Sequence, residues 1–172
     1  YFPALEAYNK VIEAKSFDAD YASFQKAICY GFLSKNDQKI ESFTNFLKNF
    51  PKSQYRDDAL FELGNTYVAE SKTELAVKTY DQLLSEFKNG SYNAKAVLKQ
   101  GLVYYNNDKD DLAIAKFKKV AADYPNTPEA VEAVATAKLI YVDNGKVDDY
   151  ATWVKTLSFV SVTDAELDND TY

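Results

Sequence analysis

Histidine is absent from the 172-residue sequence. Its absence removes the commonest general base and the commonest metal ligand. The single cysteine, Cys29, has no partner for an internal disulfide or a CxxC zinc pair. The 5 glycines do not form a phosphate-cradling loop. We therefore expect no catalytic residue, no metal site and no cofactor, and we predict that the chain is not an enzyme.

Positive charge and long apolar runs are also scarce. The chain has 20 Lys and Arg against 26 Asp and Glu, which gives a net charge of −6. No basic cluster is longer than Lys118-Lys119, so a nucleic acid is not an expected partner. The apolar runs are only a few residues long, and we expect no transmembrane segment in these residues. The sequence upstream of Tyr1 would decide whether a targeting segment precedes it.

What the chain does have is an internal repeat with a step of 37 residues. Several series of residues keep this step, and a fixed period in the range of about 20–50 residues is typical of stacked repeat arrays. They include Tyr30, Tyr67, Tyr104 and Tyr141; Ala22, Ala59, Ala96 and Ala133; Phe24, Phe61, Leu98 and Ala135; and Phe43, Tyr80, Phe117 and Val154.

The spacing inside one unit predicts two helices. Leu60, Leu63, Gly64 and Tyr67 form one apolar helical stripe, and residues 76–87 carry a second. A short polar break at 71–73 separates the two stripes, so one unit is predicted to be an antiparallel helix pair. Because a lone pair cannot bury its apolar faces, we predict an all-α solenoid of stacked pairs.

The repeat boundaries follow from the same pattern. We expect one array that is a fragment of a longer one and continues into further repeats of the same chain. Its parts are predicted as 1–19, an orphan second helix; 20–52, 53–90, 91–126 and 127–157, four repeats; and 158–172, the start of a further segment, with an alternating stretch at 159–162 and a helix start at 164–170.

Local signals predict the helix ends. Expected N-caps are Asp18 or Asp20 for one first helix and Ser53 or Asp57 for the next. Gly90 is a candidate for a left-handed residue after a helix. Thr127 and Pro128 have the pattern of an N-cap followed by proline at the first helical position.

These residues resemble the tetratricopeptide repeat family. Its pattern of Leu-Gly, Tyr, small Ala, aromatic and Pro is matched by Gly64, Tyr67, Ala76 and Tyr80, and again by Gly101, Tyr104, Ala113, Phe117 and Pro125. Several positions depart from it: the period is 37 and not 34, Ala27 and Lys138 replace the glycine, and Lys39 and Tyr150 replace the small alanine. The run from Asn49 to Leu60 resembles the joint between repeats in bacterial cell-envelope members, such as the outer-membrane assembly lipoprotein and the Tol-Pal-associated protein, although this joint also occurs in cytoplasmic members.

The resemblance implies a concave groove lined by the first helix of each pair. Asn65 fits a clamp for a partner's terminal carboxylate, but Phe61 and Leu98 stand where that clamp would need lysine. An apolar groove would instead suit an amphipathic helix or an extended segment with aromatic anchors. The predicted partner-binding residues are Tyr21, Phe24, Ile28, Phe61, Asn65, Leu98, Leu102, Tyr105 and Leu139. The alternative for each of them is packing inside the solenoid.

Three hypotheses of function remain open from the sequence. The first is a protein–protein interaction scaffold of a bacterial cell envelope, in the periplasm or associated with the outer membrane, that binds a protein or peptide segment. The second is a structural spacer with an empty groove. The third is a cytoplasmic regulatory module.

Overall fold

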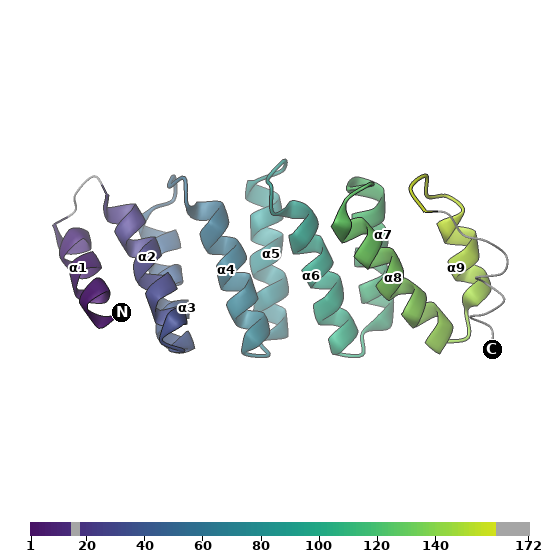
Figure 1. Cartoon of the computed structure of the whole chain (residues 1–172), viewed down its shortest axis with the longest axis horizontal. Helices are drawn as coiled ribbons and strands as arrows, with labels where there is room; N and C mark the ends of the chain where they lie inside the picture. Colours follow the sequence, from purple (N-terminus) through teal and green to yellow (C-terminus); the bar gives the residue numbers. More distant parts are fainter. Residues whose placement is uncertain (15–17, 161–172) are drawn as a thin grey trace. The chain divides into compact units, whose positions relative to one another are not determined.

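The structure is a computed structural model that describes residues 1–14 and 18–160. All regular structure in the described residues is helical, and the chain divides into two compact units, Tyr1–Gly90 and Ser91–Tyr172 (Figure 1). The first unit holds α1 (Phe2–Glu13), α2 (Ala19–Phe32), α3 (Asn36–Asn49), α4 (Arg56–Ala69) and α5 (Thr73–Glu86). The second unit holds α6 (Asn93–Asn106), α7 (Asp110–Asp123), α8 (Pro128–Asp143) and α9 (Val147–Val154).

The helices confirm the repeat predicted from the sequence. The first helices α2, α4 and α6 begin at Ala19, Arg56 and Asn93, and each is 14 residues long. The second helices α3, α5 and α7 begin at 36, 73 and 110 and have the same length. Both series therefore advance by 37 residues, and the all-α solenoid class is correct.

Within each unit the helices pack on their neighbours. In the first unit α2 packs on α1 and on α3, while α3 also contacts α4 and α4 packs on α5 (Figure 1). In the second unit α6 packs on α7, and α8 contacts α6, α7 and α9. Each second helix that contacts two first helices buries its apolar stripe in the angle between them, as stacked helix pairs require.

Two of the recurring series, the alanines that begin with Ala22 and the large residues that begin with Phe43, are buried in the core. Ala59, Ala96 and Ala133 are fully buried and let the helices approach closely. The ring of Phe43 in α3 and the ring of Tyr80 in α5 are fully buried as well, and Phe117 in α7 is their counterpart in the second unit. The period of the sequence is thus the period of core packing.

Glycine is required where the two helices of a pair cross. A Cβ atom added to Gly64 would lie only 2.8 Å from Cδ1 of Tyr80, and one added to Gly101 would lie 2.5 Å from Cε1 of Phe117. Real Cβ atoms do not approach other atoms so closely. The glycines therefore allow α4 to contact the ring from α5, and α6 to contact the ring from α7.

The turn inside each pair has one repeated backbone geometry. The residues Ser34, Ser71, Asp108 and Gly145, which are 37 residues apart, all have positive φ values between 56° and 68°. After α4, the N–H of Ser71 donates to the carbonyl of Val68, and the N–H of Lys72 donates to the carbonyl of Tyr67. These two bonds form a Schellman motif, which satisfies carbonyls at the helix end.

Several predicted helix ends need correction. Gly90 does not have positive φ; the left-handed residues are those of the turns within the pairs and Asn126, in the joint between α7 and α8. Neither Ser53 nor Asp57 is the N-cap of α4, since that position is Tyr55. Asp18 occupies the N-cap position of α2 without a side-chain cap bond. The last helix in the described residues is Val147–Val154, so the predicted repeat 127–157 ends in a helix of only 8 residues.

Two other predictions of local structure have clear outcomes. The predicted cap of α8 is confirmed, because Thr127 Oγ1 accepts a hydrogen bond from the Ala130 N–H at 3.1 Å and Pro128 begins the helix. The expected helix start at 164–170, and the end of the alternating stretch at 159–162, lie outside the described residues.

Candidate functional site

An apolar stripe runs along the first helix α2. Tyr21, Phe24, Ile28 and Phe32 are spaced as one face of a helix. Tyr21 is 42% exposed and Phe32 is 65% exposed, while Phe24 and Ile28 between them are half-buried. The ring of Tyr1 stacks on Phe32 with a centroid distance of 5.3 Å. Of the aromatic side chains that line the predicted groove in the described residues, those that stay exposed lie in this α2 stripe.

The inner part of the α2 stripe rests on an aromatic cluster. The ring of Phe24 lies 5.8 Å from Phe43 and 5.7 Å from Tyr55, measured between ring centroids. Tyr55 also lies 5.5 Å from Tyr21. The contacts with Tyr55 hold the rings of Tyr21 and Phe24 in place. Tyr21 can therefore bind a partner through its exposed surface without a large loss of side-chain entropy.

In α4 the predicted groove residues are mostly engaged inside the unit. Phe61 is only 9% exposed, and its ring lies 6.3 Å from that of Tyr80. The hydroxyl of Tyr80 donates a hydrogen bond of 2.6 Å to Oδ1 of Asn65, and burial raises the pKa of Tyr80. Phe61 and Asn65 therefore support the helix pair, and their contact with a partner stays a prediction.

In the second unit the predicted residues differ in exposure. Leu98 in α6 is only 6% exposed, and Leu102 and Tyr105 are half-buried. Leu139 in α8 is 55% exposed, and exposed Val131 and Ala135 precede it at helical spacing. Among the predicted groove helices of this unit, the exposed apolar surface therefore lies on α8. Whether any of these residues binds a partner stays a prediction.

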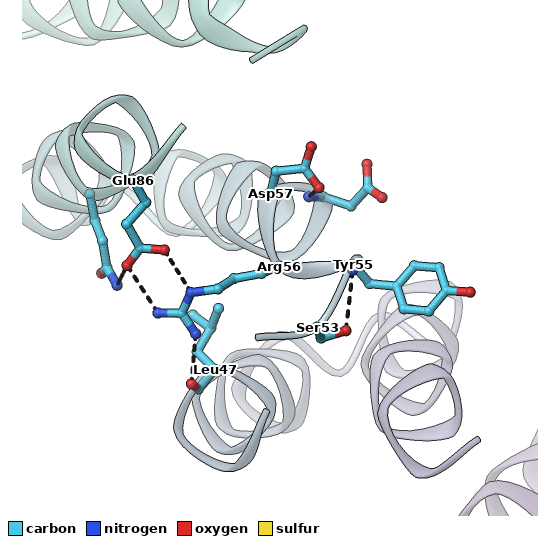
Figure 2. Close-up of polar contacts among 8 residues, drawn as sticks. Leu47, Ser53, Tyr55, Arg56, Asp57 and Glu86 are labelled. Atoms are coloured by element: carbon cyan, nitrogen blue, oxygen red, sulfur yellow. Dashed lines mark hydrogen bonds and ion pairs between the residues drawn. The ribbon is translucent and has the colours of Figure 1, made fainter. Parts of the chain in front are cut away.

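Residues of the joint between α3 and α4 form hydrogen bonds to the neighbouring helices of the first unit. Figure 2 shows Arg56, the first residue of α4, between α3 and α5. Its guanidinium donates to both carboxylate oxygens of Glu86, at 2.6 and 3.0 Å, and to the carbonyl of Leu47 at 2.8 Å. Ser53 Oγ accepts from the Tyr55 N–H at 3.2 Å and donates to Asp20 at 2.7 Å.

The charges at the joint stabilise each other. The hydrogen bond from Arg56 is the largest cause of a lowered pKa of Glu86, and the same bond raises the pKa of Arg56. The sequence did not show this pair, because the two residues are 30 positions apart. The joint motif thus serves packing between helices, which gives a physical reason for its use in repeat proteins of any compartment.

Two hollows on the second-helix side were not predicted. One has a volume of about 370 Å³ and lies over α4 between α3 and α5, with Tyr67 in its lining. The other has about 490 Å³ and lies over the end of α8 between α7 and α9, with Tyr141 in the equivalent place. Tyr67 is therefore half-buried in an open hollow, whereas Tyr141 lines its hollow with only 6% of its surface exposed. The period of these tyrosines was visible in the sequence, but the gap between successive second helices was not.

No group of three or more His, Cys, Asp or Glu side chains that could hold a metal ion lies within residues 1–14 and 18–160. Among the same residues, no helix is long and apolar enough to cross a membrane.

Comparison with known proteins establishes the class. The family model for the tetratricopeptide repeat matches residues 21–53, 58–90 and 95–127, together more than half of the chain. The chain therefore belongs to the tetratricopeptide repeat family. No curated protein sequence matches it significantly.

Solved structures of similar fold confirm the architecture. The crystal structure of MamA aligns with a TM-score of 0.68 at 22% sequence identity, and the alignment covers 88% of this chain and 82% of the MamA chain. A putative kinesin light chain from Podosopora anserina has a TM-score of 0.64 at 14% identity, with 88% and 82% covered. The C-terminal part of a repeat-containing protein from Cytophaga hutchinsonii has a TM-score of 0.66 at 19% identity, with 87% and 55% covered.

The family defines the general kind of activity. Tetratricopeptide repeats generally mediate protein–protein interaction. Such proteins are typically not enzymes.

Proposed function

We propose that this chain is a protein-binding scaffold of a bacterial cell envelope, and that the α2 stripe holds an apolar segment of its partner. The observation that carries the proposal is the exposed aromatic surface of Tyr21 and Phe32 at the two ends of one helical face. Aromatic side chains are enriched among the residues that dominate binding energy at protein interfaces. A stripe one helix long fits an amphipathic helix or an extended segment.

The distribution of exposed residues supports this surface over the one centred on Phe61. A partner gains binding energy from apolar area that it removes from water, at about 25 cal/mol per Å². Phe61 has little such area left, whereas Phe32 keeps about two-thirds of its surface. The α2 stripe therefore offers the larger apolar contact.

The envelope location is supported by the resemblance of the joint sequence to envelope members of the family. The structure gives that joint a packing role, so the location needs its own test. Cell fractionation of the native bacterium, with an antibody against this chain, should place the full-length protein in the periplasmic or outer-membrane fraction. Its recovery in the cytoplasmic fraction alone would overturn the envelope part of the proposal.

Site-specific photocrosslinking tests the binding surface itself. A benzoylphenylalanine residue placed at position 32 of the full-length protein should form an adduct with one partner protein in cells. The matched control places it at Leu112, which is 49% exposed on the second helix α7. Adducts at position 112 and none at position 32 would show that partners use another face. No adduct at either position would favour the spacer hypothesis.

A further inference from the structure

The hollow between α3 and α5 combines an apolar floor with positively charged walls. Its floor is formed by Leu63, which is buried, and by the half-buried ring of Tyr67, both from α4. Lys48 stands on the α3 wall and Lys78 on the α5 wall, and both are exposed. The volume of about 370 Å³ is within the range of small ligand pockets.

The positive charge of this hollow is not neutralised by its lining. No carboxylate is among the described residues that line it. Arg56, at one end, is already paired with Glu86. Within the described part of the chain, neither Lys48 nor Lys78 forms an ion pair. A local excess of positive charge is notable in a chain whose net charge is −6.

We propose that this hollow is a second protein-binding site, which takes an acidic segment with an apolar side chain between its carboxylates. The apolar side chain would cover Leu63 and Tyr67, and the carboxylates on either side would reach Lys48 and Lys78. The exposed side chain of Leu75 extends the apolar contact at the rim. Complementary charge of this kind gives specificity and speeds association.

The equivalent hollow in the second unit lacks this charge pattern. Two periods along the chain, Asp149 takes the place of Leu75 and Thr152 takes the place of Lys78. Its Lys118 lies over the ring of Trp153, 5.7 Å from the centroid, and Asp111 is also in the lining. The mixed charge does not select an acidic segment, so the inferred site belongs to the first unit alone.

A synthetic peptide tests the proposal directly. The probe is a fluorescein-labelled peptide with a leucine–phenylalanine core and two aspartates on each side, and its binding to the whole chain is measured by fluorescence anisotropy. The double variant Lys48→Glu/Lys78→Glu should weaken binding at least about tenfold, because two attractions become repulsions. The single variant Lys78→Glu, in the middle of α5, should show part of this loss without disturbing a helix end. A matched control, Lys88→Glu/Lys155→Glu, makes the same charge change at exposed sites outside both hollows and should bind normally.

Further measurements distinguish an acidic segment in this hollow from other ligands and other binding surfaces. A peptide in which asparagine replaces the aspartates should bind at least about tenfold more weakly to the wild type. Amide chemical shifts should change at Leu63, Leu75 and Lys78 when the acidic peptide is added. Shifts confined to Tyr21 and Phe32 would place the peptide on the α2 stripe and overturn the second site while leaving the proposed function intact. Tighter binding to anionic phospholipid vesicles than to the peptide, lost in the same double variant, would assign the hollow to a membrane surface and overturn the protein partner.

Discussion

At the scale of single residues, Gly64 and Gly101 are the glycines at which an added Cβ atom would meet a neighbouring side chain most closely. Gly64→Ala would place a Cβ atom against the buried ring of Tyr80, which is fixed by its hydrogen bond to Asn65. We expect this change to lower the free energy of unfolding by about 1–3 kcal/mol through overpacking. Chemical denaturation followed by circular dichroism measures the effect.

Gly31 supplies the control for this prediction. A Cβ atom at Gly31 would meet only the flexible side chain of Lys39, at 3.1 Å from Nζ. Gly31→Ala should therefore be neutral, or should stabilise α2 by up to about 1 kcal/mol through helix propensity. Equal stability of the Gly64→Ala variant and the wild type would show that α4 and α5 do not approach each other as described.

Residue depth is where the sequence was least informative. The 37-residue period predicted which residues share a face, and Gly64 and Tyr80 were recognised as matches to the repeat pattern. The period could not predict that Phe61 would be covered, because its burial depends on the ring of Tyr80 from the next helix. The exposure of Phe32 at the end of the α2 stripe could not be predicted for the same reason, because exposure depends on the neighbouring helices and not on sequence spacing.

At the scale of elements, the turns within the helix pairs hold non-glycine residues in a left-handed conformation. Ser71 has φ of 57° and Gly145 has φ of 68° at the equivalent place. A left-handed conformation costs a non-glycine residue about 1–2 kcal/mol. Glycine avoids this cost, but part of the advantage is lost because glycine has more conformational freedom in the unfolded state. Ser71→Gly should therefore raise the free energy of unfolding by up to about 1 kcal/mol, and Gly145→Ala should lower it by about 1 kcal/mol. Opposite signs in denaturant titrations would contradict the turn geometry.

The joint between α3, α4 and α5 should make stability depend on pH. Because the hydrogen bond from Arg56 lowers the pKa of Glu86, the pair stabilises the folded state above the unfolded pKa and loses this effect as pH falls through the folded pKa. Glu86→Gln should cost under about 1 kcal/mol at neutral pH, since Glu86 is partly exposed. The difference from the wild type should shrink between about pH 5 and pH 3. A difference that stays constant over this range would mean that the ion pair does not contribute.

Some helix ends are determined by local sequence signals, and others depend on tertiary contacts. Thr127 and Pro128 predicted the start of α8 correctly, because cap and proline act within one turn of the chain. Ser53 failed as a cap signal because its hydroxyl is used to join Tyr55 and Asp20. The left-handed turn at Ser71 could not be predicted from residue type, since the Schellman bonds impose a conformation that serine does not prefer.

At the scale of the whole molecule, a stacked array should be less stable at its ends than in its middle. In the first unit, α1 buries only Leu5, whereas α4 buries six residues. Amide hydrogen exchange should therefore be fastest in α1 and much slower in α4 and α5. Within the second unit, α9 should exchange faster than α7, since it is shorter and buries fewer residues. Greater protection in α1 than in α4 would be incompatible with nearest-neighbour stability.

The central claim is that the chain works as a scaffold through exposed apolar side chains on α2. The most direct test is the affinity of the crosslinked partner protein for purified variants, measured by isothermal titration calorimetry. Tyr21→Ala/Phe32→Ala should weaken binding by about 2 kcal/mol or more, roughly thirtyfold. The melting temperature should fall only slightly, since Phe32 is 65% exposed and Tyr21 contacts the aromatic cluster through the ring of Tyr55 alone. Leu112→Ala, on a second helix, should bind as tightly as the wild type. Unchanged affinity of the double variant, with a loss at Leu112→Ala, would contradict the account.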